Sequence, residues 1–111
     1  MPHCVIEYSQ DLKIQPESLI NVVFQGALNS QLFEESHIKT RTIAFDNYQV
    51  GAHKENFIHV TTKILSGRTL EQRSMLSESI IAALAKLNIH SANITVEVVE
   101  LERESYAKKV L

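Results

Sequence analysis

The chain has 111 residues, of which 44% are hydrophobic, and its formal net charge at pH 7 is −2. This length predicts one domain, residues 1–111, with enough apolar side chains for a core. The near-neutral charge argues against a nucleic-acid partner, and no apolar run approaches the roughly 18 residues of a membrane helix. Because the first residues lack a secretory pattern, we expect a cytoplasmic protein without a membrane partner.

The first half of the chain predicts a strand, a helix and a second strand. Residues 2–9 have a strand pattern, and a helix is expected from about 16 to 32, where Pro16 suits the first turn. The expected apolar stripe of this helix has the spacing of one helical face and consists of Ile20, Val23, Phe24, Ala27 and Leu28. Residues 38–48 are rich in β-branched and aromatic side chains and are expected to be extended. A polar connection, residues 47–56, follows.

The second half repeats this order. A third strand is expected over residues 57–65, and the segment 66–69, which contains Gly67, breaks it. Thr69 and Gln72 fit a capping box, which predicts a second helix from there to about residue 88. Its buried stripe is expected to consist of Leu76, Ile80, Leu84 and Leu87. Residues 94–101 have the pattern of a last strand, whereas the polar tail from 102 to 111 has no clear pattern.

Shifting the chain by 56 positions aligns the two halves as repeat units of about residues 2–46 and 57–102. Ile20 then falls on Leu76, and Ile38 on Ile94. A right-handed crossover makes the two strands of each unit parallel, with the helix on one face. The sequence therefore predicts an α+β fold: two pseudo-repeated β-α-β units that form a four-stranded mixed sheet with both helices on one face.

The opposite face of this sheet is expected to mix apolar and charged side chains. It would consist of Lys39, Arg41, Ile43, Phe45, Thr95, Glu97, Val99 and Leu101. Such a face is a poor solvent surface. We expect neighbouring copies of the chain to cover it in a closed homo-oligomer.

Pro2 is the first candidate for chemistry. An initiator methionine before proline is normally removed, which would leave Pro2 with a free secondary amine at the start of a strand. An α-amino group titrates at about 7.7–8.0, whereas lysine titrates near 10.4. A base with a pKa near the operating pH suits proton-transfer catalysis. The alternative is that Met-Pro is only a common way for a chain to start.

Four segments of the chain have a distinctive sequence. Residues 2–9 read PHCVIEYS, residues 59–64 read HVTTKI, and residues 63–73 read KILSGRTLEQR. The closing segment, residues 94–101, reads ITVEVVEL. Together these segments resemble the tautomerase superfamily, and within it the 5-carboxymethyl-2-hydroxymuconate isomerase family. The resemblance covers about residues 2–101. It is specific at the start and around the Gly-Arg pair, and loose in the first helix and the tail.

The resemblance implies a homotrimer that shifts a carbon–carbon double bond in an unsaturated dicarboxylate, with no cofactor and no metal. Pro2 would be the base, and Arg68 would hold a substrate carboxylate or stabilise the developing enolate. A guanidinium suits this task because its planar fork can meet two oxygens. On the second strand the family uses another arginine, whereas this chain has Lys39 there and Arg41 two positions on. Both are expected to bind substrate, and the loss of the fork at Lys39 leaves the exact substrate open.

Less specific interpretations of the same residues remain open. Arg68 could be a solvated loop residue, and Lys39 and Arg41 could be interface partners of Glu97. Arg73 is expected to form a surface ion pair. At the level of function, the alternative is a non-catalytic trimeric binding module on the same scaffold. A third possibility is a related activity, such as keto–enol tautomerisation or hydration-type dehalogenation of another acid.

Overall fold

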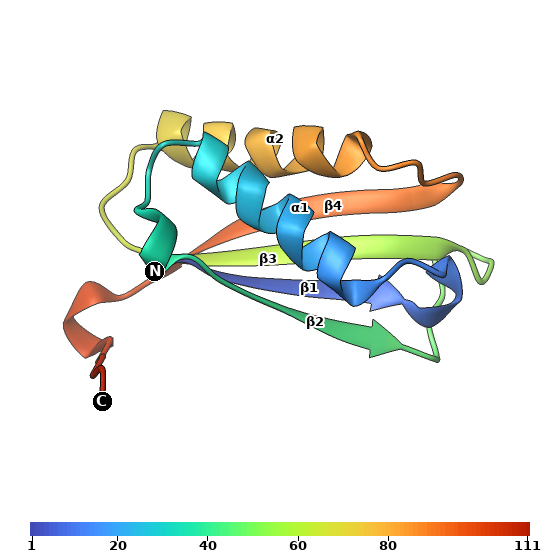
Figure 1. Ribbon diagram of the computed structural model, residues 1–111, viewed down its shortest axis with the longest axis horizontal. Helices are drawn as coiled ribbons and strands as arrows, with labels where there is room; N and C mark the ends of the chain where they lie inside the picture. Colours follow the sequence, from blue (N-terminus) through green and yellow to red (C-terminus); the bar gives the residue numbers. More distant parts are fainter.

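The computed structural model describes residues 1–111 as a four-stranded sheet covered on one face by two helices (Figure 1). The strands are β1 (His3–Ser9), β2 (Lys39–Phe45), β3 (Asn56–Leu65) and β4 (Ala92–Leu101), and the helices are α1 (Pro16–Asn29) and α2 (Leu70–Ala85). The strand order is β2-β1-β3-β4. β1 and β2 are parallel, as are β3 and β4, whereas β1 and β3 are antiparallel. The predicted mixed sheet with both helices on one side is confirmed.

Alternation along the strands separates a buried face from an open one. Cys4, Ile6 and Tyr8 of β1 are buried beneath the helices, as are the matching positions of β3. Cys4 is fully buried, and this burial raises the pKa of its thiol to about 11. The thiol therefore stays protonated at neutral pH and serves as a core residue, as its place in the first strand indicates.

Helix α2 follows its prediction closely. Thr69 caps it, because its side chain accepts a hydrogen bond from the Gln72 amide at 3.1 Å while the Gln72 side chain accepts one from the Thr69 amide at 2.9 Å. The predicted residues Leu76, Ile80 and Leu84 are fully buried. The helix ends at Ala85, three residues before the expected boundary, so Leu87, the last residue of the expected stripe, lies beyond the helix and is only partly buried.

The buried stripe of helix α1 agrees only in part with the expected one, since Val23 and Ala27 are buried as expected. Its buried residues are Leu19, Val23, Gly26 and Ala27, whereas Ile20, Phe24 and Leu28 are only partly buried. The reason is a close approach between the helices. A Cβ atom on Gly26 would lie 2.8 Å from the Ile80 Cα, so the face of α1 that carries Gly26 can come closest to α2. The helix also ends at Asn29 rather than near residue 32.

The face of the sheet away from the helices is open in the single chain. The strand registers place His3, Val5, Lys39, Arg41, Ile43, Phe45, Thr61, Lys63, Thr95, Glu97, Val99 and Leu101 on it. Ile43 is 49% exposed there, and the edge strands β2 and β4 each have one unpaired side. Both termini lie at the same end of this sheet, and the tail that follows β4 leaves on the helix-free side (Figure 1). No helix of the chain is long and apolar enough to cross a lipid bilayer.

Candidate active site

Pro2 lies directly before β1 and is fully buried. Its carbonyl accepts a hydrogen bond from the Lys39 amide at 3.0 Å, which ties the start of β1 to the start of β2. The preceding Met1 amine donates to the His37 carbonyl at 3.3 Å. The sheet therefore holds the Pro2 nitrogen, which is bonded to Met1, in a fixed position.

A cavity of about 300 Å³ adjoins this end of β1. Its lining residues are Met1, Phe33, His37, Ile64, Leu65, Arg68, Arg103, Tyr106 and Lys108. The N-terminus and Arg68 thus share one cavity, although they are far apart in the sequence. The lining includes two arginines and one lysine but no carboxylate, in a chain whose net charge is negative. This end of the sheet is therefore a suitable place for an anionic ligand.

Arg68 is held firmly in the turn before α2. Its Nη2 donates to the Leu32 carbonyl at 2.6 Å, and its guanidinium lies 5.6 Å from the centre of the Phe33 ring. These contacts leave the Nη1 and Nε donors of Arg68 without a protein partner. A positioned guanidinium with spare donors can bind a carboxylate or stabilise a developing oxyanion.

Lys39 lies close to the N-terminal amine but does not line the cavity. Its Nζ donates to the His37 carbonyl at 3.2 Å, the same oxygen that accepts from the Met1 amine. Burial lowers the pKa of the Met1 amine from 8.0 to about 6, and the charges of Lys39 and Lys108 contribute to this shift. An amine at this position is therefore largely uncharged at neutral pH.

Arg41 lies outside the cavity. It is exposed on the open face, where its Nη1 is 3.2 Å from His3 Nδ1. The predicted alternative partner, Glu97, is paired instead with His59 at 2.5 Å. Because β2 and β4 are opposite edges of the sheet, an ion pair between Arg41 and Glu97 could form only between two copies of the chain.

Arg68 is the one lining residue that was a sequence candidate. The lining residues with aromatic or ionisable side chains that the sequence did not suggest are Phe33, His37, Arg103, Tyr106 and Lys108. Three of them belong to the tail, whose only sequence signal was an aromatic residue among charged ones. Arg73, by contrast, forms the expected surface ion pair, with its Nη1 3.8 Å from a Glu100 oxygen.

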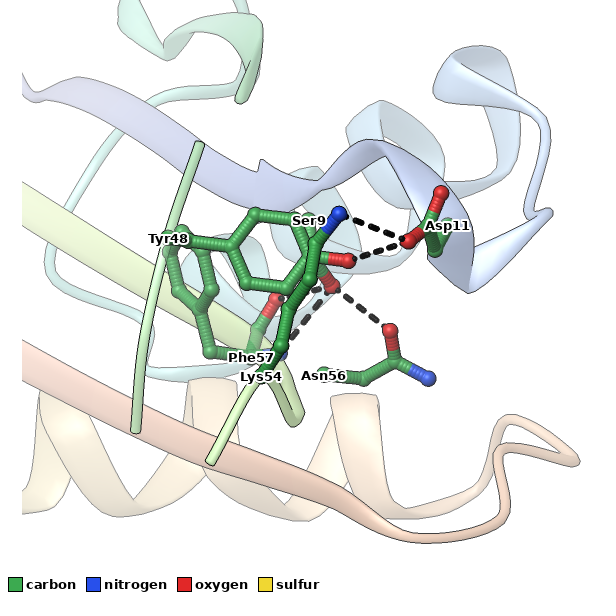
Figure 2. Close-up of polar contacts among 6 residues, drawn as sticks. All are labelled: Ser9, Asp11, Tyr48, Lys54, Asn56 and Phe57. Atoms are coloured by element: carbon green, nitrogen blue, oxygen red, sulfur yellow. Dashed lines mark hydrogen bonds and ion pairs between the residues drawn. The ribbon is translucent and has the colours of Figure 1, made fainter. Parts of the chain in front are cut away.

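A larger cavity of about 670 Å³ lies at the other end of the sheet. Two of its charged groups, Asp11 and Lys54, neutralise each other, as Figure 2 shows: Asp11 accepts from the Tyr48 hydroxyl at 2.8 Å and pairs with Lys54 at 3.4 Å. These contacts lower the pKa of Asp11. Nearby, the buried Ser9 hydroxyl donates to the Asn56 side chain at 3.1 Å. This cluster has the character of a structural clamp on the loop between β2 and β3.

The sequence was also compared with models of protein families. The model of the 5-carboxymethyl-2-hydroxymuconate isomerase family matches residues 2–109. The chain belongs to this family. No curated protein matches the sequence.

Solved structures with the same fold include members of the same family. A 5-carboxymethyl-2-hydroxymuconate isomerase from Deinococcus radiodurans R1 is 23% identical, with a TM-score of 0.74 over 97% of this chain and 88% of that one. A 5-carboxymethyl-2-hydroxymuconate delta-isomerase is 17% identical, with a TM-score of 0.74 over 99% and 88%. A fused 4-OT symmetric trimer is 14% identical, with a TM-score of 0.80 over 96% and 90%. At these identities the likenesses establish the fold of the chain.

Proposed function

We propose that the chain is a cofactor-independent isomerase that shifts a double bond in an unsaturated dicarboxylate similar to 5-carboxymethyl-2-hydroxymuconate. Removal of Met1 frees the Pro2 amine, which takes a proton from one carbon of the substrate and returns it to another. Arg68 stabilises the negative charge that develops on oxygen between the two transfers. No atom is gained or lost in this cycle, so it needs no redox partner.

The observation that carries this proposal is the shared cavity of the N-terminus and Arg68. Met1 lines the cavity and is bonded to the Pro2 nitrogen, so its removal leaves that nitrogen next to the space that Met1 occupies. The cations that lower the pKa of the Met1 amine would act on a Pro2 amine in the same direction. An uncharged amine and a fixed guanidinium together provide a base and an oxyanion partner.

The proposal is tested with untagged protein whose N-terminus has been identified by mass spectrometry. A chain that begins at Pro2 is expected to isomerise an unsaturated dicarboxylate without added metal or cofactor, in an assay that follows the change in conjugation by absorbance. A chain that retains Met1 is expected to be inactive, because its Pro2 nitrogen is an amide. Equal activity of the two forms would contradict a role for the amine. No activity of the chain that begins at Pro2 on a panel of unsaturated mono- and diacids would favour the rival, a non-catalytic binding module.

We further propose that the chain forms a homotrimer through the open face of its sheet. The mixture of apolar and charged side chains on this face, including the exposed Ile43, supports an interface. The fused 4-OT neighbour with the same fold is itself described as a symmetric trimer. Sedimentation equilibrium is expected to give three times the 12.6 kDa mass of the chain. A monomer at micromolar concentration would contradict the argument from the open face.

Lys39 is proposed to keep the Pro2 amine unprotonated. Its positive charge disfavours a second positive charge nearby, so Lys39→Gln is expected to raise the pKa of the amine. Because the base acts in its uncharged form, the acidic limb of the kcat/KM profile would move to higher pH, and activity would be lost earlier on acidification. Lys63→Gln, the same change on β3, which lies on the other side of β1, is the control. An unchanged acidic limb in Lys39→Gln would mean that Lys39 does not act on the base.

A further inference from the structure

The C-terminal tail is fastened over the cavity at two points. Arg103, in a short 3-10 turn (Arg103–Ser105), donates to the Ser66 carbonyl through Nε at 3.2 Å and Nη2 at 3.0 Å. Tyr106 lies with its hydroxyl 3.0 Å from His3 Nε2. These contacts join the tail to the turn before α2 and to the first residue of β1. The tail is thus part of the wall of the cavity.

The direction of the hydrogen bond between His3 and Tyr106 can be assigned. The Arg41 guanidinium can only donate, so His3 Nδ1 must accept, and the hydrogen of a neutral imidazole then lies on Nε2 and is donated to Tyr106. Burial, followed by the charges of Arg41 and Lys39, lowers the pKa of His3 and favours this neutral form. The tail is therefore fixed by directional contacts rather than by chance proximity.

The cations of the cavity divide into two groups by their place in the fold. Arg68 belongs to the turn before α2, and Arg103 and Lys108 belong to the tail. Lys108 forms no hydrogen bond and no ion pair with any residue of the chain, and Arg103 uses only Nε and Nη2 on Ser66. With no carboxylate in the lining, the charge of Lys108 has no neutralising partner in the protein. A bound anion would supply one.

We propose that the tail forms a second carboxylate subsite, with Lys108 as its principal cation and Arg103 as its support. This inference rests on the proposed function: one carboxylate of the substrate meets Arg68, and the distal carboxylate meets Lys108. The volume of about 300 Å³ is at the small end of ligand cavities and suits a small diacid. The tail, rather than the sheet, then determines the preference for diacids over monoacids.

The chain offers a matched control in the neighbouring residue. Lys109 has the same charge and is also exposed, but it does not line the cavity. Lys108→Gln and Lys109→Gln therefore make the same change in net charge one residue apart. Any general effect of charge on ligand approach appears in both variants, whereas loss of a subsite appears only in Lys108→Gln.

The test compares a diacid substrate with an analogue in which the distal carboxylate is replaced by a methyl group. At a pH above the acidic limb of the profile, where loss of the Lys108 charge no longer changes the protonation of the amine, Lys108→Gln is expected to raise the KM for the diacid about tenfold, the scale of one charge-assisted contact, with little change in kcat. The KM of Lys108→Gln for the monoacid is expected to stay unchanged. Lys109→Gln is expected to keep the wild-type KM for both acids. Equal effects on the two acids, or equal effects of the two variants, would overturn the subsite.

A binding measurement separates this inference from the proposed reaction. Titration calorimetry with a saturated six-carbon dicarboxylate needs no turnover, and Lys108→Gln is expected to weaken its binding about tenfold relative to wild type and to Lys109→Gln. If wild type binds the diacid but turns over no substrate, the reaction fails while the subsite stands. If Lys108→Gln binds the diacid as tightly as wild type, the subsite is disproved, whatever the activity.

Discussion

Replacing Pro2 with alanine is expected to lower the turnover of an unsaturated dicarboxylate by a factor of about a hundred or more, the usual scale of a positioned base. Alanine still permits removal of Met1 and still provides an α-amine, so the change tests the geometry of the base rather than its presence. The pyrrolidine ring of Pro2 is fully buried and fixes the direction of the nitrogen lone pair. A primary amine can rotate about its bond to Cα, and the smaller side chain leaves a gap in the packing.

The control for this prediction is the other proline of the chain. Pro16 occupies the first turn of α1, and Pro16→Ala makes the same chemical change far from the cavity. It is expected to leave kcat and KM unchanged, with at most a small change in the melting temperature. Mass spectrometry must show that wild type and Pro2→Ala both begin at residue 2. Turnover of Pro2→Ala at the wild-type rate would rule out Pro2 as the base.

Arg68→Ala is expected to lower kcat/KM for a diacid about a hundredfold, because it removes the charge-assisted hydrogen bonds to a substrate carboxylate, worth about 1.5–3 kcal/mol. The loss is expected to be at least about tenfold smaller for a neutral enol substrate, which has no carboxylate for the guanidinium to hold. The side chain also donates to the Leu32 carbonyl, so the variant must first be shown by circular dichroism to keep its fold.

Arg68→Lys separates the effect of the positive charge from that of the planar guanidinium geometry. Lysine keeps the positive charge, but it cannot form two parallel hydrogen bonds or the same contact with the Phe33 ring. We expect activity on the diacid to lie between those of wild type and Arg68→Ala. Equal losses on the diacid and on the neutral enol in Arg68→Ala would show that Arg68 has no carboxylate partner.

The sequence was most informative where local chemistry decides the structure. The capping box of α2 and its stripe of Leu76, Ile80 and Leu84 follow from spacing alone, and both are confirmed. The stripe of α1 was right at Val23 and Ala27 but wrong at its other three positions, which are only partly buried. The closest contact with α2 depends instead on the absence of a side chain at Gly26, and a pattern of hydrophobicity gives glycine little weight.

The candidate site could be predicted only in part, for a related reason. Pro2 and Arg68 were found because they lie in specific motifs, and the structure places the N-terminus and Arg68 at one cavity. The tail was missed because its contacts are polar and distant in sequence: His3 and Tyr106 are 103 positions apart. No periodic pattern records such a contact. Arg41 was a reasonable candidate from its strand face, but in the single chain it contacts His3 rather than the cavity.

Both chain termini lie at the same end of the strands, which has a practical consequence for handling the protein (Figure 1). An N-terminal affinity tag would make the Pro2 nitrogen part of an internal amide. A C-terminal tag would lie close to the tail residues that line the cavity. The loop between β2 and β3 lies at the opposite end of the strands. Gly51 in this loop is exposed, and a Cβ atom built on it would have no neighbouring heavy atom within 4 Å. Exposed loop tips of this kind accept insertions well, so a purification peptide is best inserted directly after Gly51, which keeps the glycine at a φ of 59° that other residues rarely adopt.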